Sequence, residues 1–173
     1  MDHADHVALI HDGVAPGTWA ELGSGNGAFT LALADLLGAR GRIISVDRDA
    51  GALQQQATAL NHRFPDVQLR QVVADFTGEL ELPELDGLLM ANSLHFIRDK
   101  VELLPRLVAH LRPGGRFVLV EYGTDRGNPW VPHPISFETW RRLAAGAGLG
   151  ETRRLAAVPS RFLGSIYSAQ SVR

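Results

Sequence analysis

Three glycines occupy every second position in the segment Glu21-Leu22-Gly23-Ser24-Gly25-Asn26-Gly27, and a carboxylate stands two positions before the first of them. Glycine has no Cβ atom, so such a backbone can turn sharply and let a ligand come close. The run Thr18 to Leu22 is typical of a buried strand, and apolar residues recur at helical spacing after the turn. A glycine turn that opens a helix is a common site for a polar cofactor. The residues expected to bind this cofactor are Glu21, Gly23, Ser24, Gly25 and Gly27.

Two further acidic residues follow apolar runs at positions that suit an adenosine. Asp47 lies 20 residues after Gly27, the separation at which an acid at the end of a second strand meets the two ribose hydroxyls. Asp75 can accept a hydrogen bond from an exocyclic amine such as adenine N6. Arg48 and Phe76 stand beside these acids and offer flat surfaces for stacking on the base. The sequence therefore predicts that these four residues recognise an adenosine.

Apolar runs alternate with helical patterns along most of the chain, which favours a parallel sheet covered by helices on both faces. The expected strands are Thr18–Leu22, Arg42–Val46, Val67–Ala74, Leu85–Ala91 and Arg116–Glu121, the last after a turn at Arg112-Pro113-Gly114-Gly115. The expected helices cover residues 29–37, Asp49 to His62, Lys100–Leu111 and Ser136–Ala147. The final runs, Glu151–Val158 and Gly164–Val172, are too close together for a crossover connection, so we expect an antiparallel hairpin.

In such a sheet, ligands bind beyond the carboxyl ends of the strands. Polar residues also follow the fourth and fifth expected strands, in Asn92-Ser93-Leu94-His95-Phe96 and in Glu121-Tyr122. We therefore expect the ends of all five strands to surround one crevice.

Length and composition indicate one domain over residues 1–173. The chain is 45% hydrophobic, and its formal charge of −2 gives no electrostatic attraction for nucleic acid or an anionic membrane. It has no cysteine, which excludes disulfides, thiolate zinc sites and cysteine nucleophiles. No signal-peptide pattern or apolar run of membrane-spanning length occurs, so we expect a cytoplasmic protein without membrane partners.

The order of these motifs resembles that of the class I S-adenosylmethionine-dependent methyltransferases, from Trp19 to the C-terminus. The glycine turn is similar to their motif I, Val46-Asp47 to their second-strand acid and Ala74-Asp75-Phe76 to their adenine motif. The segment that begins at Asn92 is similar to the fourth-strand motif, and the turn Arg112 to Gly115 to the one before the fifth strand. The resemblance implies a three-layer Rossmann-like α/β fold with strand order 3-2-1-4-5-7-6 and strand 7 antiparallel. It also implies S-adenosylmethionine as cofactor, S-adenosylhomocysteine as product, and Asn92 among the cofactor residues.

A dinucleotide oxidoreductase is the competing interpretation, because Gly23-x-Gly25-x-x-Ala28 also fits the relaxed Rossmann pattern. A carboxylate at Glu21 would repel a pyrophosphate, whereas it would attract the sulfonium and amino groups of S-adenosylmethionine. The closing hairpin and the absence of a second domain also favour the methyltransferase.

Methyl transfer from a sulfonium is an in-line displacement, in which positioning and desolvation of the acceptor supply much of the acceleration. A general base is needed only where the acceptor must lose a proton. His95, His133 and Tyr122 are the candidates, since each is expected at the rim of the crevice. Each also has a structural interpretation: His95 can shape its loop, His133 can belong to a rigid proline-rich connection, and Tyr122 can be a packing residue.

The acceptor is expected to be a small molecule. The fourth-strand motif lacks the Asn/Asp-Pro-Pro-aromatic signature of amino-nitrogen methylation, and cysteine-dependent cytosine methylation is excluded. The segment expected to cover the crevice is short, which leaves an open crevice, a large substrate or a partner subunit, as in a homodimer. The alternative is a methyltransferase-like protein that binds the cofactor and acts as a regulator or as a subunit of a complex.

The N-terminal segment contains Asp2, His3, Asp5, His6 and His11. These residues could be read as a metal site, but the solvated side of a short helix is the expected interpretation, and no metal is predicted. We also expect Val7 to His11 to cap the cofactor crevice, as similar segments do in the family.

Overall fold

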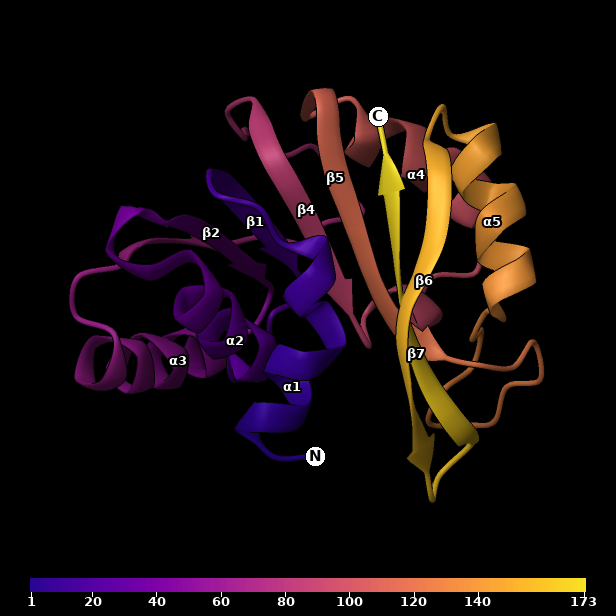
Figure 1. Ribbon diagram of the computed structural model, residues 1–173, viewed down its shortest axis with the longest axis horizontal. Coiled ribbons are helices and arrows are strands. Elements are labelled where there is room, and N and C mark those ends of the chain that lie inside the picture. The colour runs from indigo at the N-terminus through magenta and orange to yellow at the C-terminus, as the bar shows by residue number, and fades with distance from the viewer.

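One seven-stranded sheet forms the centre of the molecule in the computed structural model, which describes residues 1–173 (Figure 1). The strands are β1 (Thr18–Leu22), β2 (Arg42–Asp47), β3 (Gln68–Val73), β4 (Leu85–Ala91), β5 (Leu111–Tyr122), β6 (Gly150–Ser160) and β7 (Gly164–Val172). Their order is β3-β2-β1-β4-β5-β7-β6, with β7 antiparallel to both of its neighbours and the other pairs parallel. The predicted strand order and the terminal hairpin are confirmed.

Five α-helices cover the two faces of this sheet. They are α1 (His3–Ile10), α2 (Ala28–Leu37), α3 (Ala50–Arg63), α4 (Lys100–Val108) and α5 (Phe137–Gly146). One apolar cluster contains Leu9, Phe29 and Leu60, so α1, α2 and α3 lie on one face. The other contains Leu104 and Trp140, so α4 and α5 lie on the opposite face. The arrangement is the predicted three-layer α/β fold, and no helix has the length and apolar character needed to cross a membrane.

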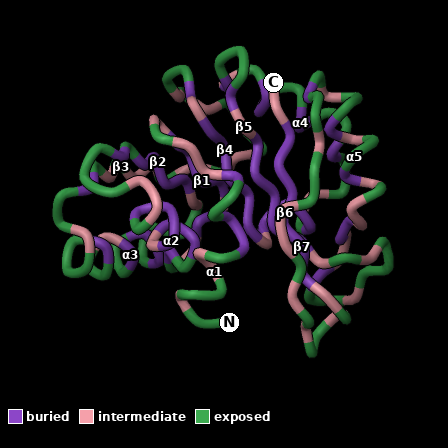
Figure 2. Tube along the Cα trace, viewed as in Figure 1, coloured by how far each residue is buried: buried purple, intermediate pink, exposed green.

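Burial is greatest in the middle of the sheet and falls toward its edges (Figure 2). Strands β1 and β4 and residues 117–121 of β5 are buried almost throughout, which is typical of strands covered on both faces. Edge strands β3 and β6 have alternating exposed positions. The rigid central strands therefore fix the positions of the loops at their carboxyl ends.

Strand β5 differs from the expectation at its start. The residues 112–115, predicted to form a turn before the strand, lie inside β5 as a bulge, because the pairing with β4 steps from Leu85–Leu111 to Gly87–Arg116. The backbone N–H of Gly114 donates to the carbonyl of Arg173, so a contact distant in sequence stabilises the bulge. The helix expected to reach Leu111 consequently ends at Val108.

Candidate active site

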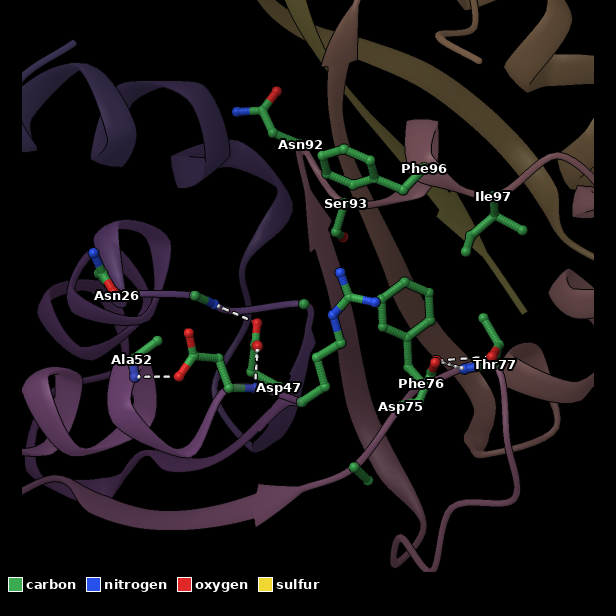
Figure 3. A pocket seen from close by; sticks show the side chains of 15 residues that line it. Asn26, Asp47, Ala52, Asp75, Phe76, Thr77, Asn92, Ser93, Phe96 and Ile97 are labelled. Atoms are coloured by element: carbon green, nitrogen blue, oxygen red, sulfur yellow. Dashed lines mark hydrogen bonds between the residues drawn. The ribbon is translucent and has the colours of Figure 1, made fainter. Parts of the chain in front are cut away.

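A cleft of about 680 Å³ opens at the carboxyl edge of the parallel strands, between the loops that follow β1, β2, β3 and β4 (Figure 3). In Figure 3, Asn26 and Asp47 lie on one side of it, and Asp75 and Phe76 lie on the other. Seven of the ten predicted cofactor residues line this cleft: Gly23, Gly25, Asp47, Arg48, Asp75, Phe76 and Asn92. Strands that are distant in the chain thus bring most of the predicted site together.

The glycine turn after β1 uses its glycines for different purposes. Gly23, Gly25 and Gly27 all have positive φ angles, of 73°, 51° and 86°. A Cβ atom at Gly27 would clash with the side chain of Gln56, whereas a Cβ atom at Gly25 would meet nothing within 4 Å. Gly25 therefore borders open space in the cleft, and Gly27 permits close packing between α2 and α3.

The two acids predicted to recognise an adenosine are held in place by backbone groups. Asp47 accepts hydrogen bonds from the backbone N–H of Gly25 at 2.7 Å and of Asp49 at 2.9 Å. Oδ1 of Asp75 accepts from the backbone N–H of Thr77 at 2.9 Å and from its hydroxyl at 2.7 Å. The hydrogen bonds from Thr77 lower the pKa of Asp75, so this side chain is an anion near neutral pH. Both acids present oriented acceptors to the cleft.

Asn92, directly after β4, has an unusual backbone and an unsatisfied side chain. Its φ angle is 53°, in the left-handed region, and its backbone N–H donates to the carbonyl of Val120 at 2.9 Å. The amide oxygen Oδ1 is buried and has no hydrogen-bond partner. A buried acceptor without a donor is costly in a folded protein. A ligand with an amino group would supply the missing donor at this wall of the cleft.

Glu21, Ser24 and Gly27 do not line the cleft. Ser24 is buried and shares a hydrogen bond of 2.7 Å with the hydroxyl of Ser45. Glu21 is 2% exposed, and its carboxyl group accepts a hydrogen bond from the hydroxyl of Thr30, which in turn accepts one from the side-chain amide of Gln56. Burial raises the pKa of Glu21 to about 8, so it is mostly uncharged at neutral pH. In this structure Glu21 supports the turn from behind rather than presenting a charge to the cleft.

The sequence profile of the methyltransferase domain family matches residues 20–117, which include the glycine turn and every strand end that lines the cleft. The chain belongs to this methyltransferase family. The predicted resemblance to the class I S-adenosylmethionine-dependent methyltransferases is thereby confirmed.

The curated relatives of this chain are longer proteins that it matches in part. Ribosomal protein L11 methyltransferase from Geotalea uraniireducens is 32% identical over 111 residues, which are 64% of this chain and 33% of that protein. The chain spans about a third of the length of the curated relatives it matches.

Two solved structures show the same fold. An O-methyltransferase family 2 protein from Planctomyces limnophilus, in complex with apigenin, has a TM-score of 0.71 and 19% identity over 98% of this chain and 57% of its own. The 1,6-didemethyltoxoflavin-N1-methyltransferase from Burkholderia thailandensis, with bound 1,6-didemethyltoxoflavin and S-adenosylhomocysteine, has a TM-score of 0.75 and 19% identity, covering 99% of this chain and 78% of its own.

A buried carboxyl partner distinguishes His95 among the three base candidates. Nδ1 of His95 lies 3.0 and 3.1 Å from the two carboxylate oxygens of Glu121, and both side chains are almost fully buried. Glu121 also accepts a hydrogen bond from the backbone N–H of Tyr122 at 2.7 Å. The other ring nitrogen, Nε2, has no hydrogen-bond partner in the protein. It also retains a small exposure to solvent. His95 therefore has one nitrogen fixed and the other free.

None of the three candidates is among the residues that line the cleft, and neither His133 nor Tyr122 has a carboxylate paired with its side chain. His133 lies beside His95 through its backbone, whose N–H donates to the carbonyl of His95 at 3.0 Å. The ring of Tyr122 lies 5.9 Å from that of His95, and burial together with the nearby Glu121 raises its pKa, so its hydroxyl keeps its proton. The sequence predicted Glu121 at the edge of the crevice but indicated no role for it. Its only signal was a carboxylate at the end of an otherwise apolar strand.

The expectation that Val7 to His11 caps the crevice is wrong. No residue of α1 lines the cleft, and Leu9 and Ile10 are buried in the apolar cluster on one face of the sheet. Asp2 caps the helix through reciprocal hydrogen bonds of 3.0 Å with Asp5. The apolar face of α1 packs against α2 and the sheet, because this contact removes the side chains of Leu9 and Ile10 from water.

Proposed function

We propose that this protein transfers the methyl group of S-adenosylmethionine to a small-molecule acceptor and that His95 is the general base. The observation that carries this proposal is the cleft at the strand ends, which runs from the Asp75–Phe76 wall, past Asp47 and Gly25, to Ser93 and Phe96. His95 does not line the cleft itself; it is almost fully buried next to Phe96, which does. Asp75, Asp47 and Asn92, at successive positions along the cleft, would bind the adenine, the ribose and the amino group of the donor.

The residues present fit S-adenosylmethionine. Asp47 would accept hydrogen bonds from the ribose hydroxyls, and Asp75 from the adenine amino group beside the ring of Phe76. The amino group of the donor would satisfy Oδ1 of Asn92, and Gly25 leaves space for the ligand. The donor supplies an already activated methyl group, so the protein has no covalent intermediate to form.

The protein's own contribution is to orient the acceptor and take its proton. With Nδ1–H donating to Glu121, the neutral imidazole of His95 has its lone pair on Nε2. The carboxylate would also stabilise the imidazolium that forms when Nε2 accepts a proton. A hydroxyl or protonated amine next to Nε2 would then lose its proton as it becomes a nucleophile.

A small acceptor agrees better with the charge of the chain than a nucleic acid does. The formal charge is −2, and a polynucleotide would need clustered lysine and arginine side chains to neutralise its phosphates. Two structural neighbours of the same fold bind small organic molecules. The ribosomal protein methyltransferase matches only part of this chain, so its protein substrate has weaker support here.

Calorimetric titration with S-adenosylmethionine and S-adenosylhomocysteine tests the cofactor site. We expect Asp47→Asn to weaken both affinities about 10- to 100-fold, because hydrogen bonds to a charged group contribute about 1.5–3 kcal/mol. Asp66→Asn, at an exposed loop position outside the cleft, is the matched control and should leave both affinities unchanged. Equal binding by a folded Asp47→Asn variant would refute the assignment, and failure of the unaltered protein to bind either compound would refute the proposed function.

A further inference from the structure

Five aromatic rings form a continuous series from the cleft, past the tip of the β6–β7 hairpin, to the loop after β5. Neighbouring ring centroids are 4.3 Å apart for Phe96 and His95, 5.9 Å for His95 and Tyr122, 5.9 Å for Tyr122 and Phe162, and 6.1 Å for Phe162 and Trp130. We call this series the aromatic wall. Phe96 also lines the cleft. The hairpin and the loop after β5 extend beyond the carboxyl ends of the parallel strands (Figure 1).

The exposed members of the aromatic wall are large apolar side chains. Phe96 is 61% exposed, Phe162 47% and Trp130 71%, and no other phenylalanine or tryptophan in the chain is exposed. The other two tryptophans, Trp19 and Trp140, are fully buried. Exposed aromatic residues that gather beside a cleft are typical of a ligand-binding surface.

The segment that holds Trp130 is firmly anchored although the ring itself is exposed. Oδ1 of Asn128 accepts hydrogen bonds of 2.9 Å from the backbone N–H groups of Trp130 and Val131, and the side chain of Val131 is buried. Nζ of Lys100 donates to the carbonyl of Ile97 at 2.6 Å and to that of His133 at 2.8 Å. Lys100 therefore ties the loop that contains Trp130 to the segment that contains Phe96. A preformed surface of this kind binds a ligand with little loss of conformational entropy.

We propose that the aromatic wall is the acceptor site and that its ligand is a planar aromatic small molecule with a phenolic hydroxyl. This inference rests on the proposed function. The flat faces of Phe96, Phe162 and Trp130 suit an aromatic ring, and the free Nε2 of His95 lies within the series. A phenol has a pKa of about 10, so histidine can take its proton far more readily than that of an aliphatic alcohol. The phenolic oxygen forms a bond to the methyl carbon, the carbon–sulfur bond breaks with its electron pair left on sulfur, and the phenolic proton passes to Nε2.

Trp130 provides the means to test this site, since it is the one tryptophan that is exposed. We would saturate the full chain with S-adenosylhomocysteine, titrate it with 2-naphthol and measure tryptophan fluorescence and heat. Saturable quenching of the unaltered protein is expected. Phe162→Ala and Trp130→Leu should weaken 2-naphthol binding, measured by calorimetry, about 2- to 10-fold each, the effect of losing one aromatic contact.

Val101→Ala is the matched control, because Val101 is 69% exposed but lies on α4 outside the aromatic wall, and this variant should bind 2-naphthol normally. Equal 2-naphthol affinity in all three variants would overturn the proposed site. Normal binding of S-adenosylhomocysteine without any binding of 2-naphthol would also overturn it, while the proposed function would stand. Binding of cyclohexanemethanol as tight as that of 2-naphthol would refute the planar aromatic class. Absence of S-adenosylhomocysteine binding would instead indicate failure of the proposed function itself.

Discussion

The carboxyl edge of the sheet has two halves, and each contains a buried glutamate at the end of a strand. After their proposed roles, we call them the donor half and the acceptor half. The donor half surrounds the cleft beside β1, β2 and β3 and contains Glu21, and the acceptor half surrounds the end of β5 and the hairpin and contains Glu121. Glu21 meets the hydroxyl of Thr30 and keeps its proton near neutral pH, whereas Glu121 accepts hydrogen bonds from His95 and from its own strand end. The same residue type at equivalent positions thus supports a turn in one half and orients an imidazole in the other.

The halves also differ in how they are assembled. The donor half consists of short loops, each next to the strand that positions it. Its acids are held by nearby backbone N–H groups: Asp75 by that of Thr77, two residues later, and Asp47 by that of Gly25 in the glycine turn. The acceptor half combines side chains from four separate segments, for example His95 with Glu121 and Phe162 with Trp130. Local geometry determines the first half, and tertiary contacts determine the second.

Replacement of Glu121 tests the acceptor half most strongly. Glu121→Gln leaves the shape of the site but removes the charge that stabilises a protonated His95, so kcat for a hydroxyl acceptor should fall about 10²- to 10⁴-fold. Steady-state assays with a labelled methyl donor would measure this loss. A positioning role, as opposed to a purely structural one, also requires a changed pH dependence of kcat with an unchanged affinity for S-adenosylhomocysteine. Turnover and a pH profile like those of the unaltered protein would contradict the assigned role.

Replacement of Glu21 should affect stability and its pH dependence. In the folded chain the pKa is raised to about 8 from an ordinary value of 4.5, so the folded state holds a proton that the unfolded chain has released between these values. Stability from this group is therefore present below about pH 4.5 and is lost as pH rises toward 8.

Denaturant unfolding of the unaltered protein and of Glu21→Gln measures this effect. Between about pH 5 and pH 7.5, the unaltered protein should lose about 3 kcal/mol more unfolding free energy than the variant. Parallel pH dependences of the two proteins would show that Glu21 is ionised in the folded state. The donor half would then contain a buried negative charge, and the contrast with Glu121 would disappear.

Replacement of Ser24 should have the smallest effect of these three replacements, and it tests whether Ser24 contacts the ligand. Ser24→Ala removes the buried hydrogen bond to Ser45 and should lower the unfolding free energy by about 1 kcal/mol, without a measurable change in S-adenosylmethionine affinity. Chemical denaturation and calorimetry on one preparation would measure both. A large loss of affinity with unchanged stability would instead make Ser24 a direct ligand, as the sequence predicted.

The resemblance to the methyltransferase family implied the sheet order, and local patterns in the sequence were sufficient for most of the cleft. A glycine turn and an acid after each apolar run are local signals, and Asp47 and Asp75 lie in the cleft because parallel strands end at a common edge. The burial of Glu21 was not visible, since it depends on Thr30 and Gln56 in two helices whose packing no local pattern specifies.

The acceptor half was predicted least well for the same reason. Phe162 meets Tyr122 only because β7 pairs antiparallel with β5, which sets Ile166 opposite Tyr122. Sequence periodicity indicated both strands but not which side chains at their ends would touch. His95 was recognisable as a candidate base, whereas its partner Glu121 became evident only from the contact between them.

Because β7 runs antiparallel to β5, the turn between β6 and β7 lies at the carboxyl edge, where a parallel strand would have had its end. Residues 161–163 form this turn, and the strand pairing resumes on both sides of it at Ser160 and Gly164. Turns of this kind accept substitutions and insertions that strands do not. After gene duplication, two copies of this chain could therefore diverge in acceptor preference through a few turn residues, while the sheet and the donor cleft stay the same.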